Sequence, residues 1–315
     1  MSNKEIYKVL CEQRQLDVPL FLQYWWMEAV CRGKTWDVAV SKDGDKVKGV
    51  MPYLYGRKMG MLYIVQPQLT QYSGPCYFYP DGLTASQRLE FEKEVASDLI
   101  AQVERLRPAV FVQNFSPAVT NWLPFYWAGY EQTTRYTYRI ADISDVGTVF
   151  DSFDVEKRQR KIRRYDGETT VRFDMSAADF ATFHRRYWQS KGSHDVLDGG
   201  LIERVCSAAT ARGNGVIAAL CDRDGRLLSA RFVVYDAHCA YSLMSAHEPS
   251  LHKNGHSETL FWKLIQYLSP LTTSFDFEGS MDEGLEYFYR SFGASQIPYS
   301  RVSKYRFYMA KKLVH

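Results

Sequence analysis

The longest regular pattern of apolar and polar positions lies between residues 84 and 107. Its apolar residues recur three or four positions apart, which is the spacing of one helix face. The residues that mark this face are Leu89, Phe91, Val95, Leu99, Val103 and Leu106. The segment Thr84-Ala85-Ser86-Gln87 offers a start for the helix. We therefore predict an amphipathic helix over 84–107.

Each half of the chain also contains the pattern of a β-hairpin. In the first half, residues 36–40 and 47–54 flank a polar turn. In the second half, residues 215–221 and 227–235 flank another, and residues 239–246 predict a further strand. The other predicted helices span 19–31, 152–165, 176–191, 200–212 and 258–268. Both halves thus share one order: helices, antiparallel strands, helix, strand, helix and strand.

A strand, a short aromatic helix and a second strand close each half. The later copy consists of Ser274–Ser280, Gly284–Gly293 and Ile297–Tyr305, and the earlier one of Ala109–Ser116, Trp122–Tyr130 and Thr134–Ile140. Such distant copies predict two similar domains, residues 1–145 and 146–315. In the earlier copy, Gln113, Asn114 and Ser116 stand where the later copy has carboxylates. We expect the chemistry to belong mainly to the C-terminal domain.

Composition narrows the class of protein. The chain has 315 residues, of which 46% are hydrophobic and 24% charged, as in soluble globular proteins with room for two cores. A net charge of +3 is too small to indicate a nucleic-acid protein. The six cysteines form no Cys-x-x-Cys pair and are interpreted as free thiols in a reducing compartment. Because no apolar signal or membrane-spanning run is present, we predict a cytoplasmic protein.

A dense basic run occupies Lys157–Arg164, where six of eight residues are positive. Such a run could hold the phosphates of a nucleotide sugar, a lipid-linked diphosphate or a tRNA backbone. A solvated helix face is the alternative interpretation. The run contains no aromatic residue for base stacking, which argues against sequence-specific recognition of nucleic acid.

Motifs for several common chemistries are missing from the sequence. It has no His and Cys constellation for a metal, no phosphate loop, no dinucleotide Gly-x-Gly-x-x-Gly and no nucleophile elbow. The sequence therefore disfavours a metalloenzyme, an enzyme that binds ATP or NAD, and a serine hydrolase.

Several segments together resemble the GNAT acyltransferase superfamily in duplicated form, and in particular its Fem-type branch. They are the strand Leu228–Tyr235, the junction Gly255–Leu268, the strand end Phe275–Gly279, the helix Phe288–Gly293 and the basic run. Their order along the chain carries the resemblance. It implies an α/β (α+β) fold of two tandem domains, each with a mixed, mostly antiparallel sheet flanked by helices.

The resemblance also implies an activity. A Fem-type enzyme transfers an acetyl or aminoacyl group, from acyl-CoA or aminoacyl-tRNA, to an amine of a cell-envelope sugar or peptide precursor. Asn254, Gly255, His256 and Ser257 would bind the donor phosphates where a helix begins. The stretch departs from the usual acetyl-CoA pattern, which opens with Gln or Arg and has two small positions. Its alternative interpretation is an ordinary helix start with Ser257 as the cap.

The same resemblance places the chemistry at the later strand end. Asp276 and Glu278 lie two apart on the predicted strand, so they should face one side and could act as acid/base or acceptor-orienting residues. His256 and His247 are further candidates for the base. Alternatively, one of them pairs with Arg231, Arg290 or Lys304. The hydroxyl of Tyr289 could protonate the leaving group, although its ring could equally serve the core. The expected substrate-binding residues are Lys157, Arg160, Lys161, Arg164, Arg231 and Arg290.

Two other functions stay open at the level of sequence. One is a degenerate GNAT-like domain that binds a nucleotide, a glycan or a partner protein without catalysis. The other is nonspecific RNA or tRNA binding through the basic run, which predicts a steep dependence on salt. The sequence does not distinguish the two donors, and it predicts no oligomeric state.

Overall fold

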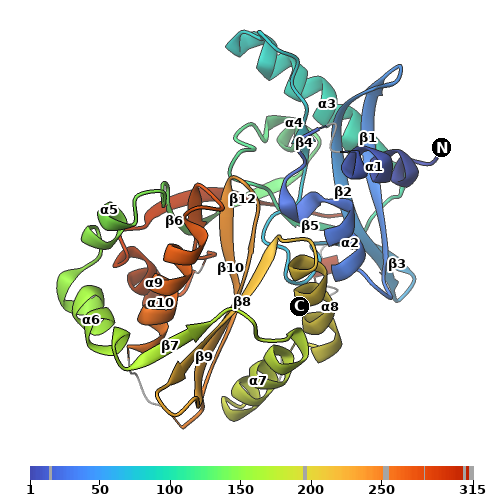
Figure 1. Cartoon of the computed structure of the whole chain (residues 1–315). Coiled ribbons are helices and arrows are strands. Elements are labelled where there is room, and N and C mark those ends of the chain that lie inside the picture. Colours follow the sequence, from blue (N-terminus) through green and yellow to red (C-terminus); the bar gives the residue numbers. More distant parts are fainter. Residues whose placement is uncertain (14–15, 194–196, 251–254, 280, 308–309, 312–315) are drawn as a thin grey trace. The chain divides into compact units, whose positions relative to one another are not determined.

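The chain forms two compact units in the computed structural model, which describes residues 1–13, 16–193, 197–250, 255–279, 281–307 and 310–311 (Figure 1). The first unit comprises residues 1–135 and 298–315, and the second comprises residues 136–297. The last strand of the chain therefore contributes to the first unit. The division into domains at residues 145 and 146 stays a prediction.

The first unit is built on a sheet in the strand order β1-β2-β3-β5-β12, with β4 paired to β2. Only β3 and β5 run parallel among its described pairs. Its helices and strands are α1 (Asn3–Glu12), α2 (Tyr24–Val30), β1 (Thr35–Asp43), β2 (Lys46–Lys58), β3 (Met61–Val65), β4 (Cys76–Tyr77), α3 (Ala85–Arg105), β5 (Val110–Asn114) and α4 (Leu123–Trp127), with a 3-10 turn at Leu20–Leu22. The strands β6 (Glu131–Ile140) and β12 (Ser295–Tyr305) each run from one unit into the other.

The second unit has the strand order β6-β11-β10-β9-β8-β7. Only β10 and β11 run parallel among these pairs, so the sheet is mixed and mostly antiparallel, as predicted. Its remaining elements are α5 (Val146–Asp151), a π-helical turn (Val155–Gln159), α6 (Arg160–Asp166), β7 (Thr169–Arg172), α7 (Ala177–Ser190), α8 (Gly199–Thr210), β8 (Gly215–Asp222), β9 (Leu227–Tyr235), β10 (Cys239–His247), α9 (His256–Leu268), β11 (Ser274–Asp276) and α10 (Glu283–Arg290).

The parallel pair formed by β10 and β11 is short, because β11 has only three residues. The candidate site lies where this pairing ends. Cys239–Tyr241 of β10 pairs with Ser274–Asp276 of β11. Beyond these residues β10 continues to His247, with a shift of register between Ser242 and Met244, while β11 has ended. The outer half of β10 therefore has no parallel neighbour in β11.

The core of the second unit lies between its sheet and α9. Leu260, Phe261, Leu264, Ile265 and Leu268 follow one another at helical spacing and are all fully buried. Burial of such a side chain stabilises the fold by roughly 1.5–3 kcal/mol. This apolar face fixes the start of α9, and with it the neighbouring site.

Most predicted elements formed, and three formed differently. The helix predicted over 19–31 is a 3-10 turn followed by α2, and the strand predicted from Ser274 ends at Asp276. The helix over 84–107 is α3, and the two predicted hairpins are β1–β2 and β8–β9. The single helix expected over 152–165 is instead the π-helical turn followed by α6. The side chain of Asp154 caps this turn at the backbone N–H of Lys157, and Gln159 donates to the carbonyls of Phe150 and Phe153. The wider turn brings Arg158 and Gln159 inside the protein.

Candidate functional site

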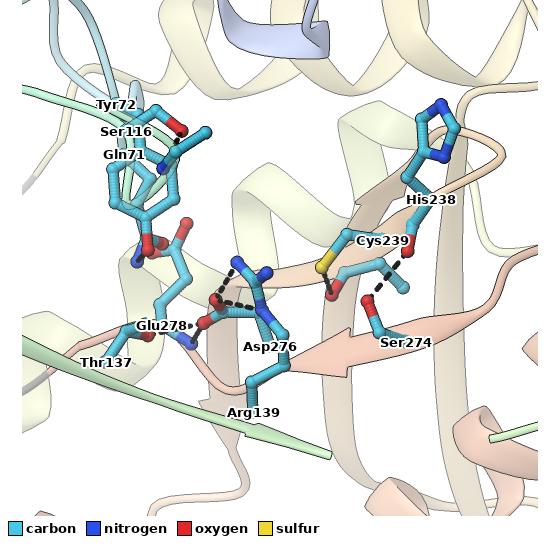
Figure 2. A network of polar contacts seen from close by, with 12 residues as sticks. Gln71, Tyr72, Ser116, Thr137, Arg139, His238, Cys239, Ser274, Asp276 and Glu278 are labelled. Carbon is cyan, nitrogen blue, oxygen red and sulfur yellow. Dashed lines mark hydrogen bonds and ion pairs between the residues drawn. The ribbon is translucent and has the colours of Figure 1, made fainter. Parts of the chain in front are cut away.

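Asp276 ends β11 and is held by a network of polar contacts (Figure 2). Its side chain is fully buried and forms an ion pair with Arg139 of β6, at 3.0 Å between Oδ2 and Nη2. It also accepts hydrogen bonds from the Thr137 hydroxyl and from the backbone N–H of Glu278. Burial raises the pKa of Asp276 in spite of the opposing charge of Arg139. Asp276 is thus an internal ion-pair partner, but its partner is Arg139 and not Arg231, Arg290 or Lys304.

Glu278 lies in a strained backbone conformation just beyond β11. Its φ of 62° is left-handed, which costs a residue with a side chain about 1–2 kcal/mol. The prediction that Asp276 and Glu278 share one face of a strand is therefore wrong, because the strand ends before Glu278. Its Oε1 atom is buried and has no hydrogen-bond partner among the described residues. Burial, followed by the charge of Asp276, raises the pKa of Glu278 well above its usual range.

Arg231 is a buried cation on β9. Its side chain donates from Nη1 to the hydroxyl of Ser242, at 2.7 Å, and its guanidinium lies 3.7 Å from the centroid of the Phe261 ring. The Nε atom is buried and has no partner among the described residues. Burial lowers the pKa of Arg231 to about 10. Ser242 directly follows Tyr241, the last residue of β10 that pairs with β11, and it begins the register shift of β10. The Arg231 side chain therefore lies where β10 and β11 cease to pair.

Tyr289 of α10 connects these groups. Its ring packs on Phe277, with 5.2 Å between ring centroids, and is half-buried. Burial raises the pKa of its hydroxyl, Arg231 lowers it, and Glu278 and Asp276 raise it further. The pKa of this hydroxyl thus responds to one cation and two carboxylates, which suits a group that passes a proton. Its neighbour Tyr287 is exposed and lies beneath the Lys157 ammonium instead.

A cavity of about 370 Å³ lies beside the start of α9. It is lined by both polar and apolar side chains: Arg158, Lys161, Tyr187, Lys191, Leu228, His247, Glu248, Pro249, His256, Ser257, Glu258 and Phe288. The buried carboxylate of Glu258 accepts from Arg158 and from Lys161, each at 2.9 Å. Arg158 and Lys161 are thus the two members of the basic run that line this cavity, and Lys161 is one of the residues that we expected to bind substrate.

The start of α9 is not capped by a side chain. Gly255 is the N-cap residue, so the interpretation of Ser257 as the cap is wrong. His256 and Ser257 both line the cavity. A Cβ on Gly255 would lie 2.8 Å from the Tyr165 ring and 3.0 Å from Cβ of Lys161. Glycine is therefore required here for the packing of α9 against α6. Asn254 lies outside the described residues.

The other residues expected to bind substrate lie on exposed helix surfaces. Arg160 pairs with Glu156, and Arg290 pairs with Glu286 within α10. Arg164 lies beside the ring of Tyr165. None of Lys157, Arg160, Arg164 and Arg290 is among the residues that line the described cavity. These positions have the features of a solvated helix face, and their role in binding stays a prediction.

Two residues of the site, Arg139 and Glu258, were not selected from the sequence. They form ion pairs with Asp276 and with Arg158 of the basic run, across elements that are far apart in the chain. His247 ends β10, lines the cavity and contacts the Ser229 hydroxyl through Nδ1, at 3.0 Å. Burial lowers the pKa of His247 to about 4, so its ring is neutral near pH 7. No periodicity marks these residues, because their positions depend on how the elements pack.

In the part of the chain that the structure describes, no group of three or more His, Cys, Asp or Glu side chains is placed to hold a metal ion. No helix there has both the length and the apolar character needed to cross a membrane.

Comparison with known proteins identifies the class of this unit. Residues 154–287 match the family model of the acetyltransferase (GNAT) domain. A search of the curated proteins finds no match. The solved structures include FemX, with a TM-score of 0.68 and 13% identity over 95% of this chain and 96% of FemX.

Two further structures share the fold over nearly the whole chain. The C-terminal domain of a protein described as a lysylphosphatidylglycerol synthetase, from Agrobacterium fabrum, has a TM-score of 0.60 and 13% identity, covering 99% of this chain and 96% of that domain. A tandem GNAT protein from the clavulanic acid biosynthesis pathway has a TM-score of 0.54 and 8% identity. The match covers 96% of this chain and 93% of that protein.

The GNAT prediction is confirmed. Residues 154–287 belong to the acetyltransferase (GNAT) domain family, and the chain as a whole has the fold of tandem GNAT and Fem-type proteins. The predicted class of enzyme is therefore that of an acyltransferase.

Proposed function

We propose that the second unit transfers an acetyl or aminoacyl group from acyl-CoA or aminoacyl-tRNA to an amine. The acceptor we propose is a sugar or peptide precursor of the cell envelope, reached in the cytoplasm. The observation that carries the proposal is the uncapped start of α9, which opens on a cavity lined by cations within a GNAT domain. The choice of acceptor comes from the Fem-type resemblance.

The residues at the start of α9 fit an anionic donor. The first backbone N–H groups of a helix attract negative charge, and no side chain caps them here. Lys161 and Lys191 add ammonium groups at the cavity, while Glu258 withdraws part of that charge. Backbone amides of His256 and Ser257, together with Lys161, would hold the donor phosphate. The donor itself would supply the activated acyl carbonyl.

The chain's own residues then account for the movement of protons. An amine must lose a proton as it attacks a carbonyl, and the partly buried carboxylate of Glu278, whose Oε1 has no described partner, is the base we propose. The Tyr289 hydroxyl would give a proton to the leaving group. Asp276 would act as a positioning residue, since it accepts the backbone N–H of Glu278 and is itself held by Arg139.

The experiment that tests the donor site measures binding of CoA and acetyl-CoA to the full chain by titration calorimetry. Lys161→Ala should weaken binding roughly tenfold, because it removes one charged hydrogen bond. Arg160→Ala is the matched control, since Arg160 is exposed and pairs with Glu156. Binding to wild type that neither variant changes would place the donor elsewhere.

The two donors are distinguished by a second titration, with aminoacyl-tRNA. If CoA does not bind and aminoacyl-tRNA does, the donor is the aminoacyl-tRNA. If neither binds, the proposal fails. Substituting Gly255 with a bulky residue is a poor test, because it would disturb the packing of α6 against α9.

One observation favours the alternative of a domain that binds a nucleotide, a glycan or a partner protein without catalysis. Glu258 lies in the first turn of α9, where it already uses Arg158 and Lys161 as partners. An internal carboxylate thus takes part of the charge that a donor phosphate would use. Binding of a ligand with no turnover of any acyl donor would support this alternative.

A further inference from the structure

Arg231 is a buried cation without a described counter-charge. Its side chain is 6% exposed, yet it forms no ion pair with any described carboxylate. Two other arginines of this unit differ, because Arg139 pairs with Asp276 and Arg158 pairs with Glu258. Burial of an unpaired charge costs several kcal/mol even after relaxation of the protein. Keeping the unpaired Arg231 buried lowers the stability of the fold. A role in binding an anionic ligand would explain why the residue is there.

The surroundings of Arg231 are polar but neutral. Ser242 accepts one hydrogen bond, Phe261 stacks on the guanidinium, and the hydroxyls of Tyr187 and Tyr289 lie close enough for the charge to act on them. The ring of His247, which also senses this charge, is itself neutral near pH 7. These groups orient the guanidinium without neutralising it.

The Nε edge of the guanidinium differs from the nitrogen that Ser242 occupies. Nη1 is bonded to Ser242, whereas the buried Nε has no hydrogen-bond partner among the described residues. Arg139 uses the same edge for a carboxylate, since its Nε and Nη2 atoms both donate to Oδ2 of Asp276, at 3.2 and 3.0 Å. Two parallel N–H groups along this edge match the geometry of a carboxylate.

We propose that Arg231 binds a carboxylate carried by one of the two substrates, through Nε and Nη2. This inference rests on the proposed acyl transfer, because it adds a substrate class to the same site. Glu278, whose Oε1 also has no described partner, would meet the amine. The charges of Arg231 and Glu278 both act on the pKa of the Tyr289 hydroxyl. An amine with a nearby carboxylate, as in an amino acid or the end of a peptide, satisfies both groups.

The carboxylate has two possible sources, which the probes separate. Glycylglycine and its C-terminal amide differ in the carboxylate of the acceptor. Succinyl-CoA and acetyl-CoA differ in a carboxylate on the acyl group. Binding of each probe to the full chain is measured by titration calorimetry, without turnover. We expect at least a tenfold preference for the carboxylate member of one pair, and that pair identifies the source.

The variants then assign the preference to Arg231. Arg231→Met should abolish it, and Arg231→Lys should retain part of it. Arg172→Met is the matched control, because Arg172 is exposed on β7 and pairs with Asp174. The thermal unfolding temperature of Arg231→Met should not fall, since an unpaired buried charge has been removed. If Arg231→Met does not fold, the conservative Arg231→Lys variant still shows whether the preference for the carboxylate probe is reduced.

Two outcomes overturn the inference: no preference in either pair, or a preference that Arg231→Met leaves unchanged. These failures are separate from failure of the proposed function. Acyl transfer without any preference for a carboxylate would refute only the role of Arg231. A preference that depends on Arg231, with no transfer from any donor, would refute the acyltransferase and keep the binding site.

Discussion

The two units begin their long helices in opposite ways. In the first unit, Thr84 and Gln87 form a capping box at the start of α3, in which each side chain accepts the other's backbone N–H. In the second unit, α9 begins at Gly255 without a side-chain cap, and its first residues line a cavity. A capped helix start has satisfied its own donors, whereas an uncapped one can offer them to a ligand.

The strand ends differ in the same sense. Gln113 near the end of β5 is fully buried and donates to the carbonyl of Pro52, and Asn114 follows it. Near the end of β11 stand Asp276 and Glu278, which are charged groups in a low-dielectric environment. Burial of an ionised carboxylate costs more than burial of a neutral amide, so this strand end is the more costly one to fold. The comparison teaches where function is to be sought, although the absence of chemistry in the first unit stays a prediction.

The largest expected effect is the loss of acyl transfer in Glu278→Gln. Removal of a general base should lower kcat by about 10²–10⁴, while the exposed Glu283→Gln should leave it unchanged. Steady-state kinetics with the donor identified above makes the measurement. A decrease of less than roughly threefold would rule out Glu278 as the base.

Glu278→Gly provides the structural control for that result. Glycine adopts a left-handed φ without penalty, and the variant also removes a buried carboxylate. Its thermal unfolding temperature should therefore not fall, although transfer is lost. Asp276 requires its own variant, because Asp276→Asn leaves Arg139 without its charged partner.

The next effect is on stability and compares one ion pair from each unit. Glu258→Gln leaves the buried Arg158 without a counter-charge, which should cost about 3–5 kcal/mol of the free energy of unfolding. Glu104→Gln in the first unit weakens a partly exposed pair with Lys304, which should cost about 1 kcal/mol or less. Urea unfolding of both variants measures the two losses in the free energy of unfolding. Equal losses would mean that the pair of the second unit is no more buried in solution than that of the first.

The rate of transfer should depend on the raised pKa of Glu278. A base is active only when deprotonated, so kcat should rise about tenfold per pH unit below this pKa and level off above it.

The stability of the fold should change with pH in the opposite sense. The contribution of Glu278 is fully present below the ordinary value of 4.5 and is lost as pH rises through the raised pKa. Glu278→Gln should therefore gain stability relative to wild type as pH rises. A pH profile with an inflection at the ordinary value would contradict this.

The smallest effect compares the two helix starts directly. Thr84→Ala removes the capping box of α3 and should cost about 1 kcal/mol of stability, with no change in transfer. Ser257→Ala should cost far less, since Ser257 does not cap α9. Thermal unfolding of the two variants makes the comparison. A loss in Ser257→Ala equal to that in Thr84→Ala would show that Ser257 does serve as the cap.

The sequence by itself determined the elements and the class of fold. The apolar period of 84–107 predicted α3, the polar turns predicted both hairpins, and the ordered segments of the second half led to the GNAT domain. These features are local, because a helix face or a turn is defined by residues a few positions apart. Asp276, Glu278 and Tyr289 were selected at one strand end and the helix after it, and Arg231 on an earlier strand, all through the resemblance to the Fem-type branch.

Only the tertiary structure decided how these groups are paired. Arg139 lies 137 positions from Asp276, and Arg158 lies 100 positions from Glu258, so no local pattern links either pair. The left-handed turn at Glu278 separated two acids that alternation had placed on one face. The lack of a described charged partner for Arg231 depends on every element that surrounds it. Register and packing set these partners, and neither is encoded in the spacing of residues along one element.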